Sequence, residues 1–155
     1  MNKFIVKQID SASAGQTEKI AEQIGRKLKG GEVMELVSDL GGGKTTFVRG
    51  LAHGLGSTAQ VSSPTFKISN EYRCPNFRLY HFDFYRLVEP GLISNELAEI
   101  IGDPEAIIII EWGEIMQNVL QRERLTINFK TTGKSSRQLE LSCPSELDYL
   151  LPEQA

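Results

Sequence analysis

Residues 33–46 read Val-Met-Glu-Leu-Val-Ser-Asp-Leu-Gly-Gly-Gly-Lys-Thr-Thr, a mainly apolar run that leads into a glycine-rich loop. The apolar run has the length and composition of a buried strand. Beyond the loop, Phe47, Leu51 and Leu55 recur at helical spacing until two glycines end the pattern. A strand that passes through a glycine-rich loop into a helix is the structural context of a phosphate-binding loop.

The loop follows the pattern G-x-x-x-x-G-K-[ST] at every defined position except the first, where Ser38 replaces glycine. Glycines let the backbone adopt positive φ and approach a phosphate closely, and loop N–H groups and the next helix attract the anion. Lys44 is expected to neutralise the β- and γ-phosphates, and the Thr45 hydroxyl to bind Mg²⁺. A flexible glycine turn with an exposed lysine is the alternative. The predicted ATP-binding residues are Gly41, Gly42, Gly43, Lys44, Thr45 and Thr46.

The other segments alternate between strand-like and helix-like patterns, which predicts an α/β fold. Ser13 and Gln16 have the spacing of a capping box, in which each side chain accepts from the other residue's backbone N–H. The 155 residues are expected to form one P-loop NTPase-like domain, 1–155. We expect a mixed sheet of about seven strands, parallel at its centre with antiparallel additions and flanked by helices. Elements expected after the loop helix are a hairpin (66–72 and 77–85), helices (95–101 and 114–120) and strands (107–110, 125–129 and 138–141).

A carboxylate for a nucleotide-bound Mg²⁺ is expected at a strand end near the loop. Residues 107–110 are four isoleucines, which is typical of a strand buried in a parallel sheet, and Glu111 follows them. Ligands gather beyond the carboxyl ends of such strands. Glu111 is therefore the predicted catalytic and metal-binding acid, although the residue could also simply begin the next loop.

A second acid, Asp83, lies in the segment His81-Phe82-Asp83-Phe84-Tyr85. With a period of two residues, its polar side chains share one face and the phenylalanines share the other. This polar face could line an active site or be the wet face of an edge strand, and alternation alone leaves both open. The predicted catalytic residues are therefore Lys44 and the two acids Asp83 and Glu111. A lone histidine or tryptophan is more often structural.

The composition is that of an ordinary globular protein, with a net charge of −3 and 40% hydrophobic residues. The chain shows no basic stripe of the kind that nucleic-acid-binding proteins carry, so any service to RNA is expected to run through a partner. Two distant cysteines and the absence of a signal-peptide pattern or a long apolar run predict a cytoplasmic protein without a membrane segment.

Several motifs together resemble the TsaE family of bacterial P-loop ATPases, which act in tRNA threonylcarbamoyladenosine (t6A) synthesis. They are the loop at 38–46, Ser-Pro-Thr-Phe at 63–66, His-Phe-Asp-Phe-Tyr-Arg-Leu at 81–87 and Glu-Trp at 111–112. The resemblance implies ATP hydrolysis with Mg²⁺ that supports turnover of a TsaD–TsaB complex, with tRNA met only through these partners. It also implies that Thr45 and Glu111 hold Mg²⁺, that Asp83 lies in the active site, and that Ser13 and Arg137 touch the nucleotide.

Other functions share part of this pattern. A GTPase normally shows an N-K-x-D element, which this sequence lacks, so ATP is favoured. A small-molecule or nucleoside kinase also combines a phosphate loop with acids on a neighbouring strand, but no long arginine-bearing lid insertion is visible. A non-hydrolytic, ATP-sensing binding module is the third reading. Release of free phosphate from ATP would indicate an ATPase. A phosphorylated metabolite would indicate a kinase, and binding without turnover would indicate a sensing module.

Overall fold

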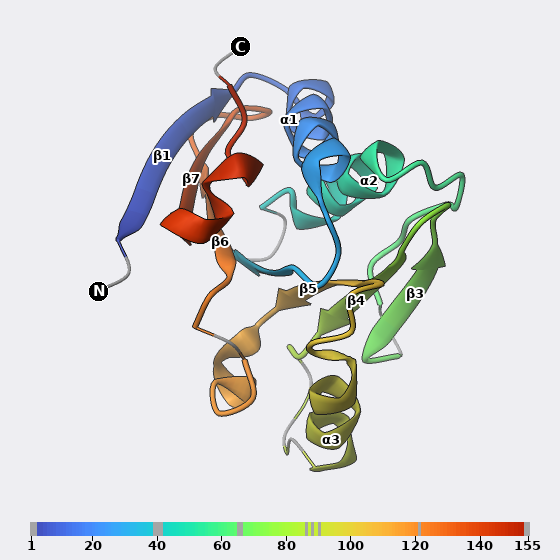
Figure 1. The fold of residues 1–155 in the computed structure, drawn as a ribbon. Coiled ribbons are helices and arrows are strands. Elements are labelled where there is room, and N and C mark those ends of the chain that lie inside the picture. Colours follow the sequence, from blue (N-terminus) through green and yellow to red (C-terminus); the bar gives the residue numbers. More distant parts are fainter. Residues whose placement is uncertain are drawn as a thin grey trace.

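The computed structural model describes residues 3–38, 42–64, 67–85, 87, 89, 91–120 and 122–153. Its helices lie on both sides of one sheet (Figure 1). The strands are β1 (Phe4–Ser11), β2 (Val33–Val37), β3 (Ser69–Arg73), β4 (Arg78–Asp83), β5 (Ala106–Glu111), β6 (Leu125–Thr131) and β7 (Arg137–Pro144). The helices are α1 (Ala14–Lys27), α2 (Lys44–Gly54) and α3 (Gly91–Ile100), with 3₁₀ turns η1 (Gly113–Met116) and η2 (Ser145–Leu150).

The seven described strands lie in the order β1-β7-β6-β2-β5-β4-β3. Strand β2 pairs in parallel with both β6 and β5, and β4 pairs in parallel with β5. Strands β1, β7 and β3 join by antiparallel pairing. The predicted α/β fold, with a parallel centre and antiparallel additions, is therefore confirmed.

Strand β5 separates two hydrophobic cores, and all six of its residues are buried. Ile107 and Ile109 pack with α1 and α2 in the first core, while Ile108 and Ile110 pack with α3 and η1 in the second. A strand covered on both faces needs apolar side chains at every position, which explains the run of isoleucines. The same face of the sheet that holds Ile109 also faces α2, the helix that follows the phosphate loop.

Several local expectations differ from the structure. Ser13 does cap α1, because its Oγ accepts from Gln16 N at 3.1 Å. The Gln16 side chain, however, accepts from Ala12 N rather than from Ser13 N, so the reciprocal half of the predicted capping box is absent. Helix α3 runs from Gly91 to Ile100, so it begins before the helix that was predicted at 95–101. The helix that was predicted at 114–120 is instead a 3₁₀ turn over Gly113–Met116.

The two helices on the first core, α1 and α2, cross at unusually close range because glycines stand at the crossing. A Cβ on Gly50 would lie 2.3 Å from Glu18 O and 2.7 Å from Ala21 Cβ. The crossing ties the helix that begins at the phosphate loop directly to α1. Within the described residues, no helix is both long and apolar enough to cross a membrane.

Replacing Gly50 with alanine is expected to lower the free energy of unfolding by about 1–3 kcal/mol, the usual range for overpacking a tight core. Gly15→Ala is the matched control, because its Cβ would meet only Ser13 Oγ, at 3.9 Å. That substitution is expected to add about 0.5–1 kcal/mol through the higher helix propensity of alanine. Urea unfolding measures both variants. Equal stability of the Gly50 variant and the wild type would contradict the close crossing.

Candidate functional site

The carboxyl ends of β2, β5 and β4 lie at one edge of the sheet, because these strands run in parallel. Helix α2 begins at this edge. Its N-cap, Gly43, has φ 97° in the left-handed region, where a side chain would be strained. A Cβ here would meet nothing closer than Arg137 Nε at 4.0 Å, so φ rather than space requires the glycine. Gly41 lies outside the described residues.

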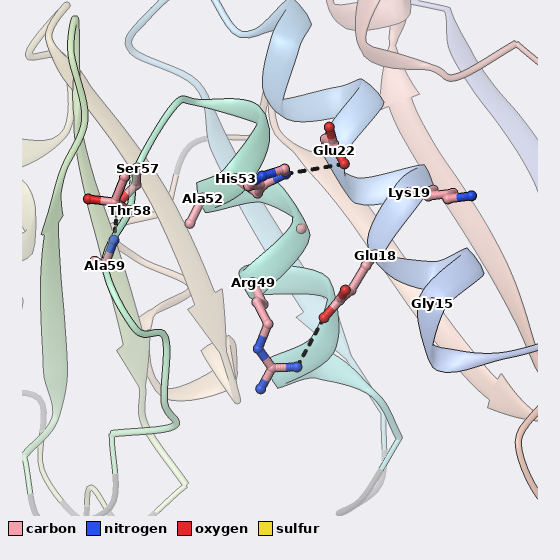
Figure 2. A pocket seen from close by; sticks show the side chains of 11 residues that line it. Gly15, Glu18, Lys19, Glu22, Arg49, Ala52, His53, Ser57, Thr58 and Ala59 are labelled. Carbon is pink, nitrogen blue, oxygen red and sulfur yellow. Dashed lines mark hydrogen bonds and ion pairs between the residues drawn. The ribbon is translucent and has the colours of Figure 1, made fainter.

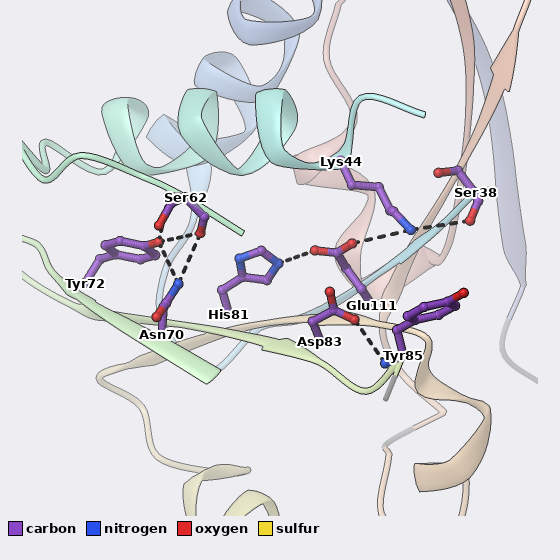
Figure 3. A network of polar contacts seen from close by, with 9 residues as sticks. All are labelled: Ser38, Lys44, Ser62, Asn70, Tyr72, His81, Asp83, Tyr85 and Glu111. Atoms are coloured by element: carbon purple, nitrogen blue, oxygen red, sulfur yellow. Dashed lines mark hydrogen bonds and ion pairs between the residues drawn. The ribbon is translucent and has the colours of Figure 1, made fainter. Parts of the chain in front are cut away.

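Lys44, the first residue of α2, is buried and directs its ammonium group across the strand ends. Its Nζ lies 3.3 Å from Ser38 O and 3.3 Å from Glu111 Oε1 (Figure 3). This ion pair joins the helix that follows the glycine loop to the carboxyl end of β5. The exposed-lysine alternative from the sequence does not hold, since only 7% of Lys44 is exposed.

Glu111 is the buried acid at the end of β5, and both of its carboxylate oxygens have partners. Oε1 pairs with Lys44, and Oε2 forms a short contact with Nε2 of His81. Burial alone would raise the pKa of Glu111, but the contacts with His81 and Lys44 outweigh it and leave this pKa below its ordinary value. The carboxylate is therefore ionised and fixed in orientation.

Asp83 ends β4 and stands opposite Glu111 in the strand register. One of its oxygens, Oδ1, accepts from Tyr85 N at 3.0 Å. Burial raises the pKa of Asp83, and the charge of Glu111 raises it further, against a lowering contribution from the bond to Tyr85 N. Two carboxylates with opposite pKa shifts thus face the end of α2.

The alternative interpretation, in which the polar face of the His81 segment is the solvent-exposed face of an edge strand, is wrong for this fold. Strand β4 lies between β5 and β3 rather than at the sheet edge, and His81 is fully buried. The prediction that Tyr85 belongs to the same strand face also fails, because β4 ends at Asp83. Tyr85 instead contacts Trp112, with ring centroids 4.9 Å apart.

Trp112 has a strained backbone next to the acid. With φ 56°, it is the one non-glycine residue at positive φ in the described part of the chain. Such conformations cost about 1–3 kcal/mol and tend to occur at functional sites. The Trp112 ring packs against the second core and lies 4.7 Å from Lys44 Nζ. It therefore serves as a core residue and as one wall of the site.

One hollow of about 310 Å³ is lined by Lys44, both carboxylates and Trp112. Two hydroxyl residues of α2, Thr45 and Thr46, line it beside both carboxylates. Ser63 also lines it, although the sequence identified only its loop and not this residue. The complete described lining is Gly42, Gly43, Lys44, Thr45, Thr46, Ser63, Asp83, Glu111 and Trp112.

The segment before β3 is held in place by the buried Tyr72. The Tyr72 hydroxyl donates to Ser62 O at 3.0 Å and accepts from Ser62 N at 3.2 Å. Asn70 Nδ2 reaches the same carbonyl at 3.1 Å (Figure 3). These bonds explain how Ser63, the next residue, is positioned against the hollow.

A second hollow, of about 490 Å³, adjoins the amino end of α1. It is lined by Asp10, Ser11, Ala12, Gln16, Thr132, Ser136 and Arg137. Arg137 links it to the phosphate loop, because its Nε donates to Gly42 O at 3.3 Å. Ser13 lies between two lining residues, but its hydroxyl is engaged in capping α1. The structure thus brings Arg137 to the loop and leaves Ser13 beside it.

A third hollow lies between α1 and α2, away from the strand ends, and has a volume of about 470 Å³ (Figure 2). Its charged walls pair with each other: Arg49 Nη1 lies 3.1 Å from Glu18 Oε1, and His53 Nδ1 lies 3.3 Å from Glu22 Oε2. None of the predicted site residues lines it. The candidate site is therefore the hollow at the amino end of α2.

Comparison with known proteins places the chain among t6A proteins. The family model "Threonylcarbamoyl adenosine biosynthesis protein TsaE" matches residues 11–139. The tRNA threonylcarbamoyladenosine biosynthesis protein TsaE of Bacillus subtilis is 35% identical over 140 residues, 90% of this chain and 87% of that protein. The protein of that name from Aquifex aeolicus is 40% identical over 112 residues, 71% of this chain and 79% of that protein.

A solved structure supports the same relationship. The crystal structure of Bacillus subtilis YdiB superposes with a TM-score of 0.75 at 32% identity, covering 97% of this chain and 93% of that one. The sheet order and the glycine-capped helix with its lysine define a P-loop NTPase-like protein. More specifically, the chain belongs to the TsaE family, whose members act in t6A biosynthesis.

Proposed function

We propose that this chain binds ATP·Mg²⁺ and hydrolyses ATP, and that hydrolysis supports turnover of a TsaD–TsaB complex in t6A modification of tRNA. The observation that carries the proposal is the single hollow that joins the amino end of α2, Lys44 and two carboxylates. A helix amino end with a lysine attracts phosphates, and the acids supply the metal and water chemistry that phosphoryl transfer needs.

The phosphates of ATP would occupy the hollow beside Gly42, Gly43 and the start of α2. They would then compete with Glu111 for the ammonium group of Lys44, which lies 3.3 Å from Glu111 Oε1. When Lys44 turns to the phosphates, that oxygen becomes free to accept a cation. Binding of the nucleotide and release of the metal-binding acid are thus one event.

The donor set of the hollow fits Mg²⁺, which prefers oxygen ligands. The hydroxyl of Thr45 and the carboxylate of Glu111 line it together, with Asp83 opposite. Within the described residues, no group of three or more His, Cys, Asp or Glu side chains could hold a metal ion. This agrees with a Mg²⁺ bound through one or two protein groups and substrate phosphates. The ion would offset charge that develops on the transferred phosphoryl group.

The nucleoside would extend from the phosphate loop toward the second hollow. Arg137 spans the two, because it bonds to Gly42 O and also lines that hollow. Ser13, at the start of α1, would lie near the nucleoside because Ala12 and Gln16 line the second hollow. Its hydroxyl caps α1 and would not make the contact. In this proposal, Ser13 and Arg137 therefore belong to the nucleoside end of the site.

The relatives' names supply the pathway, and the charge of the chain agrees with an indirect role on tRNA. The net charge is −3, so electrostatics give the chain no strong affinity of its own for nucleic acid. We infer that TsaD and TsaB make the contact with tRNA, and that the protein works in the cytoplasm, where tRNA is modified.

Steady-state phosphate release at saturating ATP·Mg²⁺, with and without purified TsaD–TsaB, tests the proposal. We expect slow release from the chain alone and a clear acceleration as the complex is added. Charge supplied in trans can accelerate related hydrolases by about 10³–10⁵-fold. A phosphorylated metabolite in place of free phosphate would indicate a kinase, and ATP binding without turnover in the full assembly would indicate a sensing module. An unchanged rate despite demonstrated complex formation would reject the dependence on partners.

A further inference from the structure

A buried histidine lies beside the proposed metal-binding acid. His81 lies on β4, one strand away from Glu111, and its side chain is fully buried. Its Nε2 contacts Glu111 Oε2 (Figure 3). Because Glu111 is ionised and can only accept, the histidine donates from Nε2.

Packing alone does not explain a histidine at this position. The other ring nitrogen, Nδ1, is buried without a hydrogen-bond partner among the described residues. An unsatisfied buried polar atom costs about 1–3 kcal/mol, which an apolar side chain of similar size would avoid. The bond to Glu111 is therefore the feature that distinguishes histidine from leucine at residue 81.

The two partners of Glu111 differ in what happens to them when nucleotide binds. Lys44 holds Oε1 and, on the proposed function, moves to the phosphates. His81 holds Oε2 from the middle of a paired strand and stays in place. Without it, the carboxylate would lose its remaining direct partner at the moment when it has to present one oxygen to the cation.

We propose that His81 is a positioning residue for Mg²⁺: it holds one oxygen of Glu111 so that the other faces the cation when Lys44 leaves. The inference rests on the proposed function. Groups that orient metal-binding side chains typically change metal affinity or activity by about 10–100-fold when removed. His81 is not expected to touch the nucleotide, because its ring is buried and is not part of the described lining of the hollow.

Two substitutions separate the hydrogen bond from the shape of the ring. His81→Leu removes the donor, whereas the amide of His81→Gln can still donate to Glu111 from a similar distance along the side chain. We expect His81→Leu to raise the half-saturating Mg²⁺ concentration for phosphate release by about 10–100-fold. The KM for ATP at saturating Mg²⁺ should change much less, and His81→Gln should recover most of the Mg²⁺ dependence.

A binding measurement gives a readout that does not need turnover. The probe is the non-hydrolysable analogue adenylyl imidodiphosphate, followed by Trp112 fluorescence with and without Mg²⁺, since Trp112 contacts Lys44. The gain in affinity that Mg²⁺ confers should fall in His81→Leu and be kept in His81→Gln, while metal-free binding stays the same.

The outcomes separate this inference from the proposed function. If the wild type binds no ATP·Mg²⁺, both fall together. If the wild type binds it and His81→Leu shows wild-type Mg²⁺ dependence, only the role of His81 is overturned. Equal defects in both variants would also overturn it, because the ring and not the hydrogen bond would then matter. If His81→Leu does not fold, the folded His81→Gln protein is compared with Glu111→Gln. Loss of Mg²⁺ dependence in His81→Gln as large as in Glu111→Gln would overturn the role of His81. Near-normal Mg²⁺ dependence in His81→Gln would support it.

Discussion

Replacing Lys44 with alanine is expected to lower kcat/KM for ATP by at least about 10²–10³-fold, the usual loss when one positioned donor to a developing charge is removed. Lys44 begins α2 and lines the hollow of about 310 Å³ at the amino end of this helix, the proposed phosphate hollow. In the proposed function, Lys44 contacts the phosphates in both the ground state and the transition state. We therefore expect weaker ATP binding as well as slower hydrolysis.

Lys44→Ala also breaks the ion pair with Glu111, so a loss of fold has to be separated from a loss of function. Glu111 keeps its contact with His81 in this variant, which should preserve the strand ends. Lys19→Ala is the matched control, because Lys19 is an exposed lysine of α1 that does not line the phosphate hollow. Phosphate release and urea unfolding are measured on both variants. Wild-type phosphate release from a folded Lys44→Ala protein would reject the role of the loop.

The strand Val33–Val37 and the helix Lys44–Gly54 were predictable because their determinants are local. A short apolar run indicates the strand, and Gly43 at positive φ shows why glycine is needed before the helix. The four isoleucines before Glu111 predicted a buried strand for a similar reason. These two segments place the lysine and the acid at the same sheet edge.

Contacts between distant segments were not predictable from the local pattern. The bond between His81 and Glu111 depends on the register of β4 against β5, which no spacing within either segment reveals. Ser63 reaches the hollow because Tyr72, on β3, holds the neighbouring residue. Even the alternation that predicted a polar face failed at Tyr85, since a strand pattern does not show where the strand ends.

If the chain hydrolyses ATP as proposed, the position of Asp83 makes this acid the candidate for orienting the attacking water. Asp83 stands opposite Glu111 across β4 and β5 and lines the phosphate hollow. Glu111 is held by His81 and Lys44, whereas among the described residues Asp83 has a hydrogen-bond partner at one oxygen, the backbone N–H of Tyr85. Its other oxygen is thus available to accept a proton or a hydrogen bond from water.

Replacing Asp83 with asparagine is expected to lower kcat by about 10²–10⁴-fold, the usual contribution of a positioned acid or base, with little change in the KM for ATP. Asparagine keeps the size of the side chain and the oxygen that accepts from Tyr85 N, so the turn after β4 should survive. Asp103→Asn is a close control, because Asp103 Oδ1 accepts from the backbone N–H two residues later in the same way, at 2.9 Å, but on the exposed turn before β5.

Single-turnover and steady-state phosphate release, with nucleotide affinity measured by Trp112 fluorescence, distinguish the roles of Asp83. Since burial and the charge of Glu111 raise the pKa of Asp83, the wild-type rate should fall as the pH drops through a value above the ordinary aspartate range. The pKa of Glu111 is lowered, so Glu111 stays ionised over the same range and does not produce this loss. The acid limb should disappear in Asp83→Asn and persist in Asp103→Asn. Full activity of Asp83→Asn in the assembly with TsaD–TsaB would show that the water is oriented by another group.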